Sequence, residues 1–188
     1  SDSTNGQFQR DLLTVLFGLG SLELKDGRTD RALGLFEEAT AVARRLLALN
    51  PQNAEARRDL FVCHNRVGDA HLARGRVARA REAYERSLEL SSALAAASPG
   101  NVGARTDEIV SLFKLGEAAR AAGDCARASG FWRRARGILV TLAAQGRIEP
   151  GSSRTATWTA ELDEKLASCG AGVRPSAPPP RPPGPPPR

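Results

Sequence analysis

The sequence has no methionine, one tyrosine and two histidines, and only three of its 27 basic residues are lysines. Two histidines and no glycine-rich nucleophile elbow leave too few groups for a nucleophile, a base and an orienting residue. Adjacent carboxylates such as Glu37 and Glu38 point apart on a helix. We therefore expect no catalytic residues, no cofactor and no enzyme activity. The absence of methionine even at position 1 leads us to expect a fragment of a longer protein.

The sequence also lacks a long apolar run and a basic, apolar leader, so we expect neither a membrane span nor a signal peptide. Its three cysteines, Cys63, Cys125 and Cys169, are an odd number and form no Cys-x-x-Cys pair. This pattern argues against a disulfide framework and favours a reducing compartment. We expect a cytoplasmic protein without a disulfide framework.

The sequence does contain an internal repeat. A shift of 48 residues superposes seven columns three times, with asparagine, aspartate, aliphatic, glycine, alanine and aromatic positions recurring at fixed places. A period of this length is typical of a solenoid. The columns that we assign structural roles are glycine at Gly20, Gly68 and Gly116, alanine at Ala32, Ala80 and Ala128, and aromatic at Phe36, Tyr84 and Trp132.

Each repeat is predicted to form two helices. In the second repeat, Asn53 is expected to cap a helix from Ala54 to about Ala73, which ends at Gly75. A second helix is expected from about Val77 to the Ser-Pro-Gly sequence that begins at Ser98. The small residues in the glycine and alanine columns are expected to let the two helices approach closely, and the aromatic residue to fill space between neighbouring hairpins.

The repeated columns resemble the tetratricopeptide repeat (TPR) signature, in a variant with long helices. The match covers about Asn5 to Gly146, and the 48-residue unit departs from the ordinary unit of about 34 residues. The resemblance implies an all-α, right-handed solenoid of three helical hairpins, with repeats at 5–52, 53–100 and 101–148. It also implies a scaffolding or sensing segment of a larger bacterial signalling protein.

The resemblance further implies a concave groove, lined by the first helix of each unit, that binds a protein partner as a peptide or a helix. The positions that we expect to contact the partner are Phe17, Asn65, Asp69, Phe113 and Glu117. An alternative is that Phe17 and Phe113 simply pack against their neighbours. Phe17 and Ser21 replace the Lys and Asn of the carboxylate clamp found in some TPR domains, so no such clamp is predicted.

The two ends of the chain are expected to differ from the repeats. Residues 1–4 resemble an inter-repeat or upstream linker, and residues 155–169 carry an apolar stripe suited to a capping helix. The alternative for this last helix is the start of a further repeat. Residues 170–188 are predicted to be a disordered, proline-rich tail, with nine prolines between Pro175 and Arg188. A P-x-x-P-x-R docking peptide within the tail is the alternative.

Three other functions can be compared with the sequence. His64, His71 and Cys63 lie on one helix but lack the paired spacing of a metal site, so no metal is predicted. Two arginine clusters could form an outer ridge that binds nucleic acid or another anionic surface. The third function is self-association through the N-terminal hairpin. The arginines of the two clusters are Arg74, Arg76, Arg79 and Arg81, and Arg133, Arg134 and Arg136.

Overall fold

The computed structural model of the chain describes residues 2–149 and 152–170, which form seven α-helices and no strand. The helices are α1 (Asp2–Lys25), α2 (Thr29–Leu49), α3 (Ala54–Ala73), α4 (Val77–Ala97), α5 (Val102–Ala121), α6 (Cys125–Ala144) and α7 (Ser153–Gly170). The predicted bounds of α3 and the start of α4 are confirmed. The predicted linker at residues 1–4 is wrong for residues 2–4, because α1 begins at Asp2.

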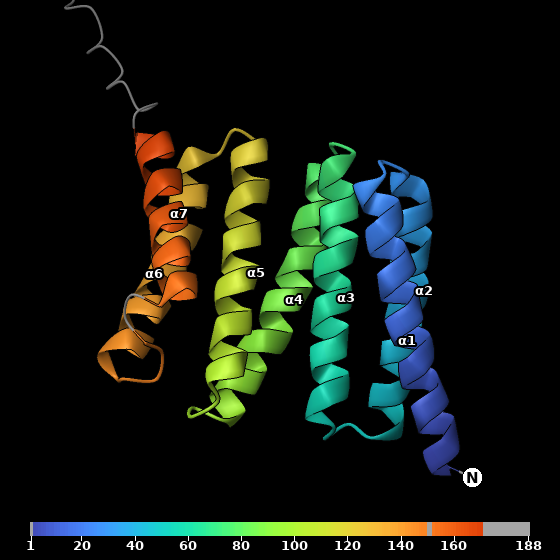
Figure 1. The fold of residues 1–188 in the computed structure, drawn as a ribbon. Helices are drawn as coiled ribbons and strands as arrows, with labels where there is room; N and C mark the ends of the chain where they lie inside the picture. The colour runs from blue at the N-terminus through green and yellow to red at the C-terminus, as the bar shows by residue number, and fades with distance from the viewer. Residues whose placement is uncertain (1, 150–151, 171–188) are drawn as a thin grey trace, which may run out of the picture.

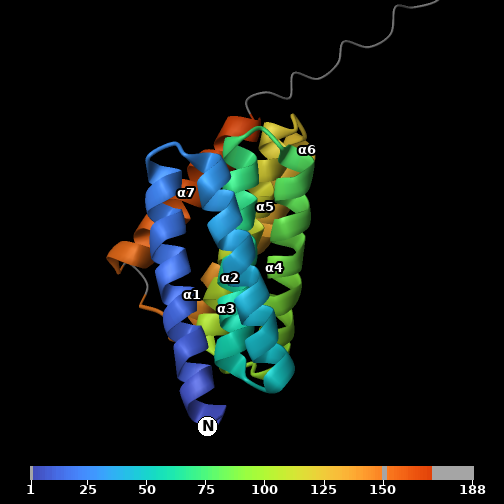
Figure 2. The same cartoon turned by 90° about the vertical axis from the view of Figure 1, so that its right-hand side faces the viewer.

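The helices pack in chain order, each against the next, as a row of antiparallel hairpins (Figure 1). One layer contains α1, α3, α5 and α7, and the other contains α2, α4 and α6 (Figures 1 and 2). The N-terminal hairpin forms one end of the row, and α7 covers the other end. The all-α hairpin architecture expected from the sequence is confirmed.

Local sequence signals set the ends of the helices. The side chain of Asn53 accepts hydrogen bonds from the backbone N–H groups of Glu55 and Ala56, at 3.0 and 3.1 Å, which confirms the predicted cap. Within each hairpin, the turn contains a glycine with positive φ, which only glycine adopts readily. These glycines are Gly27, Gly75 and Gly123, with φ of 77°, 68° and 79°.

The repeated glycine and aromatic columns meet inside each hairpin. A Cβ atom added to Gly20 would lie 2.6 Å from Cε1 of Phe36. A Cβ atom added to Gly116 would lie closer still to the Trp132 ring, with Nε1 as the nearest atom. The first helix therefore needs glycine to make room for the ring on the second helix. We predicted this close approach of the two helices, but expected the alanine column to contact the glycine. In the structure the aromatic ring contacts it.

A different set of positions packs each hairpin on the one before it. Ala56, Leu60 and Cys63 of α3 share a buried cluster with α2 residues such as Val42. In α5, Leu115 and Ala118 share a cluster with Tyr84 of α4. The inter-hairpin core thus combines small residues with leucines, where α3 packs on α2 and where α5 packs on α4.

A disulfide joins Cys125, the first residue of α6, to Cys169 near the end of α7, with 5.3 Å between their Cα atoms. The sequence analysis argued against a disulfide framework and did not predict this single bond. Spacing in sequence did not reveal the pair because 44 residues separate the two cysteines, and the fold brings them together. The C-terminal helix is covalently tied to the third hairpin. The predicted tail lies, beyond Gly170, outside the described residues.

Candidate functional site

An apolar pocket of about 190 Å³ opens between α5 and α7, in the layer that holds the first helix of each hairpin. It lies at the C-terminal end of the row, where α7 adds its side chains to those of α5. The residues that line the pocket are Ile109, Val110, Phe113, Lys114, Trp158, Glu161 and Leu162. Its walls are mainly aliphatic and aromatic, with one basic and one acidic residue. Such a composition suits an apolar side chain with polar groups around it.

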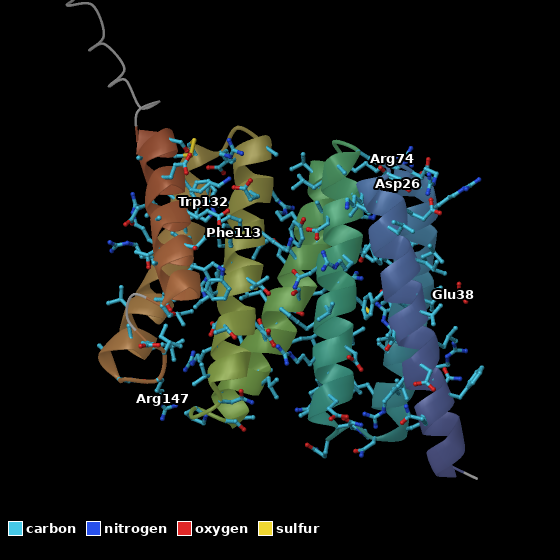
Figure 3. All side chains as sticks on the ribbon, viewed as in Figure 1. Asp26, Glu38, Arg74, Phe113, Trp132 and Arg147 are labelled. Carbon is cyan, nitrogen blue, oxygen red and sulfur yellow. A yellow bond between two sulfur atoms is a disulfide. The ribbon has the colours of Figure 1, made fainter. Side chains whose placement is uncertain are left out.

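Phe113 is held in place on two sides. The indole N–H of Trp132 donates a 3.2 Å hydrogen bond to the backbone oxygen of Phe113, and both residues are labelled in Figure 3. The ammonium group of Lys165 lies 5.6 Å from the centre of the Phe113 ring, within the range of a cation–π contact. Phe113 is therefore a fixed wall of the pocket.

Asp69 is part of a polar network that joins the second and third hairpins. Its carboxylate accepts a 2.8 Å hydrogen bond from the Tyr84 hydroxyl and forms a 2.6 Å ion pair with Lys114. The same lysine lies 5.7 Å from the centre of the Tyr84 ring. Burial, followed by the neighbouring Asp69 carboxylate, raises the pKa of Tyr84, so the hydroxyl stays protonated and donates. This network fixes Lys114 at the edge of the pocket.

Glu117 occupies the same repeat position as Asp69 and also pairs with a lysine from the following element. It forms a 2.9 Å ion pair with Lys165 of α7 and a 3.3 Å ion pair with Arg120. Lys165 thereby contacts both Phe113 and Glu117. Two of the five positions expected to contact a partner, Asp69 and Glu117, thus have intramolecular partners in this structure.

The remaining two expected positions lie away from the pocket. Phe17 is half-buried and packs against two clusters that contain residues of α2 and α3. Asn65 is only 5% exposed, and its side-chain oxygen has no hydrogen-bond partner in the described part of the chain. Among the five positions, Phe113 alone lines the pocket.

The two histidines lie together in a polar cavity of about 300 Å³ formed by α2, α3 and α4. Burial, helped by Arg44 and Arg86, lowers the pKa of His64 to about 4, and burial also lowers the pKa of His71. Burial raises the pKa of the Cys63 thiol to about 12. Residues 2–149 and 152–170 contain no group of three or more His, Cys, Asp or Glu side chains arranged to hold a metal ion.

The predicted arginine ridge contains several arginines that already pair with carboxylates. Arg74 pairs with Asp30, Arg81 with Glu85 at 3.5 Å, and Arg136 with Asp163 at 2.6 Å. Each pair reduces the positive charge that the ridge presents to an anionic partner. Three of the seven arginines of the two clusters are therefore paired with carboxylates within the chain.

Sequence reasoning missed three residues of this region: Lys114, Trp158 and Lys165. Lys114 and Lys165 are two of the three lysines in an arginine-rich chain, which was the available signal. Lys165 also lies 48 residues after Glu117, the repeat length itself. Trp158 was recognised only as part of the apolar stripe of the last helix.

Comparison with solved structures finds a TPR-like protein from Chlorobium tepidum, with a TM-score of 0.60 and 11% sequence identity. The match covers 88% of this chain and 98% of that protein. At this identity the similarity concerns the fold, which is TPR-like. No protein-family model matches the sequence, and the comparison with curated proteins finds no match. Within the described residues, none of the helices has the length and apolar character to span a bilayer.

Proposed function

We propose that this chain is a protein-binding module, without enzymatic activity, that holds a peptide or helix of its partner on the layer of α1, α3, α5 and α7. The α5–α7 pocket is the observation that carries the proposal. Its volume of about 190 Å³ suits one apolar side chain of the partner, which would contact Phe113, Trp158 and Leu162. Lys114 and Glu161 at the same pocket would bind polar groups of the partner segment.

The structure around the pocket limits the entropy cost of binding on the receptor side. Phe113 is held by the Trp132 hydrogen bond and by Lys165, and Lys114 is held by Asp69. The α7 wall is tied to α6 by the disulfide. A site whose side chains are already ordered loses little conformational freedom when a partner binds. We further propose that the module belongs to a larger bacterial signalling protein.

A pocket-filling variant tests this proposal. Peptides would be selected from a displayed random library on the immobilised chain, and the affinity of each labelled peptide would be measured by fluorescence anisotropy. Val110→Phe should fill the pocket and weaken binding of the selected peptides at least about tenfold, a loss of about 1.4 kcal/mol. Leu49→Phe is the control, because Leu49 is an exposed apolar residue of α2, in the other layer and outside the pocket.

Two results would contradict the proposal. One is that no peptide is enriched; the other is that selected peptides bind Val110→Phe and the wild type equally well. A labelled single-stranded oligonucleotide, measured in the same assay at two salt concentrations, tests the arginine ridge instead. Tight, salt-sensitive binding of the oligonucleotide without peptide binding would favour the nucleic-acid alternative.

A further inference from the structure

The outward face of α1 carries large apolar side chains that the rest of the described chain does not cover. Phe8 is 64% exposed, Val15 55%, Leu19 48% and Leu22 53%, and Leu12 between them is half-buried. These five residues form the outer α1 stripe. Four large exposed apolar side chains on one helix face are unusual for a surface that only meets water. In Figure 2 the N-terminal hairpin lies at the front, at the open end of the row.

The spacing of the outer α1 stripe is that of a helix-pairing seam. Its members follow one another at steps of four, three, four and three residues, from Phe8 to Leu22. This alternation keeps an apolar line facing one partner helix over two heptads. The flanking Asp11 and Lys25 lie beside the line and do not interrupt it. The stripe is therefore suited to an α-helix.

The residues of α3 and α5 that lie 48 and 96 positions after the stripe residues show how this face packs inside the row. The positions 48 residues after Phe8, Val15 and Leu22 are Ala56, Cys63 and Ala70, all buried in α3. In α5 the same positions are Ala104, Ser111 and Ala118, also buried. The Ser111 hydroxyl even lies 2.9 Å from that of Ser87 in α4. At these three positions the inter-hairpin packing uses small side chains. The positions equivalent to Leu12 and Leu19 are Leu60 and Val67 in α3, and Glu108 and Leu115 in α5.

The outer α1 stripe replaces those small residues with Phe, Val and Leu. A further hairpin packed on α1 as α2 packs on α3 would meet side chains too large for that spacing. Two identical stripes can instead face each other at the wider spacing of a coiled-coil seam. Each stripe is apolar along its whole length, so a second copy presents a matching surface without opposing like charges.

We propose that the outer α1 stripe is a homodimer interface, where α1 pairs with α1 of a second copy of this chain. The interface lies on the first hairpin, whereas the α5–α7 pocket lies at the other end of the row. Dimerisation thus leaves both pockets open and places two binding sites in one assembly. This inference does not depend on the proposed function.

The test uses charge variants of the stripe and sedimentation velocity over a concentration series. The wild-type chain should shift with concentration from 20.0 kDa to twice that mass. The double variants Val15→Glu/Leu19→Glu and Val15→Lys/Leu19→Lys should each raise the dissociation constant at least about thirtyfold, which corresponds to about 2 kcal/mol. An equal mixture of the two should recover a dimer containing one of each.

The matched control is Leu49→Glu/Val140→Glu, which introduces the same charges at exposed apolar residues of α2 and α6. It should dimerise like the wild type, and circular dichroism should show unchanged helicity in all variants. A wild type that stays monomeric at every concentration would overturn the proposal, as would dimers that survive in either charge variant. Failure of the mixture to associate would overturn pairing of α1 with α1.

Discussion

The two ends of the row differ in how the outermost helix of the first layer is held. At the C-terminal end, α7 is joined to α6 by a disulfide, and Lys165 pairs with Glu117 of α5. At the N-terminal end, α1 packs on α2, pairs with α3 through Arg10 and Glu55, and leaves four large apolar residues exposed. The C-terminal end is held by bonds within the chain, whereas the N-terminal end has an exposed apolar surface for association. The same repeat thus supports a fixed pocket at one end and an open seam at the other.

Removal of the disulfide should produce the largest loss in the free energy of unfolding. It should also make the two ends of the row more alike in stability. The Cys125→Ser/Cys169→Ser variant no longer closes a loop of 44 residues. The chain-entropy relation gives a loss of about 3–4 kcal/mol in the free energy of unfolding. Chemical denaturation measures the loss, and hydrogen exchange should show the greatest change in α7 and little in α1.

Cys63 provides the control for this prediction, because its thiol is buried and unpaired with another cysteine. Cys63→Ala should leave α7 exchange unchanged, and reduction of this variant should still loosen α7. Equal exchange rates in α7 before and after reduction would contradict the role assigned to the disulfide.

Acid should weaken the middle of the row rather than either end. The pKa of His64 falls from 6.5 to about 4 on folding, because burial and the nearby Arg44 and Arg86 disfavour the charged ring. Below pH 6.5 the unfolded chain takes up a proton that the native chain refuses until about pH 4. Stability should therefore fall across this window, by about 3 kcal/mol in total. Urea denaturation at several pH values measures the slope.

The His64→Gln variant isolates this contribution from other titrating groups. Burial raises the pKa of Asp59 and Asp107, so these carboxyls add stability as the pH falls and oppose the histidine effect. The difference between wild type and variant cancels them. If both proteins lose stability with the same slope between pH 6.5 and 4, His64 is not the source of acid sensitivity.

The sequence predicted the repeated part of the molecule better than its ends. Columns repeated three times revealed the hairpins, and Asn53 and Gly75 correctly marked helix ends, because caps and positive-φ turns depend on local chemistry. The disulfide and the α5–α7 pocket depend on residues brought together by packing across hairpins. Phe113 was found among the groove positions that the TPR resemblance implies, whereas Trp158 and Lys165 come from a helix outside the three repeats.

The start of α1 shows a further limit of the column pattern. The sequence predicted a first repeat that begins at Asn5 and a linker at residues 1–4 before it. In the structure α1 already includes Asn5 and continues from Asp2. An asparagine cap begins a helix only where the preceding chain turns back, as it does at Asn53 between α2 and α3.

Replacing the repeated glycine with alanine also tests the comparison between the two ends, and its expected effect on stability is the smallest. Gly116→Ala places a Cβ against the Trp132 ring, and Gly20→Ala places one against Phe36 at a slightly larger distance. Overpacking costs about 1–3 kcal/mol, offset by about 0.5–1 kcal/mol from the higher helix propensity of alanine. We expect the net loss in unfolding free energy, measured by urea denaturation, to be greater for Gly116→Ala.

The difference arises because α5 lies between neighbours, whereas α1 has an open outer side and can shift away from Phe36. Gly137→Ala and Gly34→Ala are the matched controls, since a Cβ at either exposed glycine meets no atom within 4 Å. Both controls should stabilise their helices by about 0.5–1 kcal/mol. A loss at Gly20→Ala as large as that at Gly116→Ala would show that α1 is held as firmly as α5, and the contrast between the two ends would then rest on the disulfide alone.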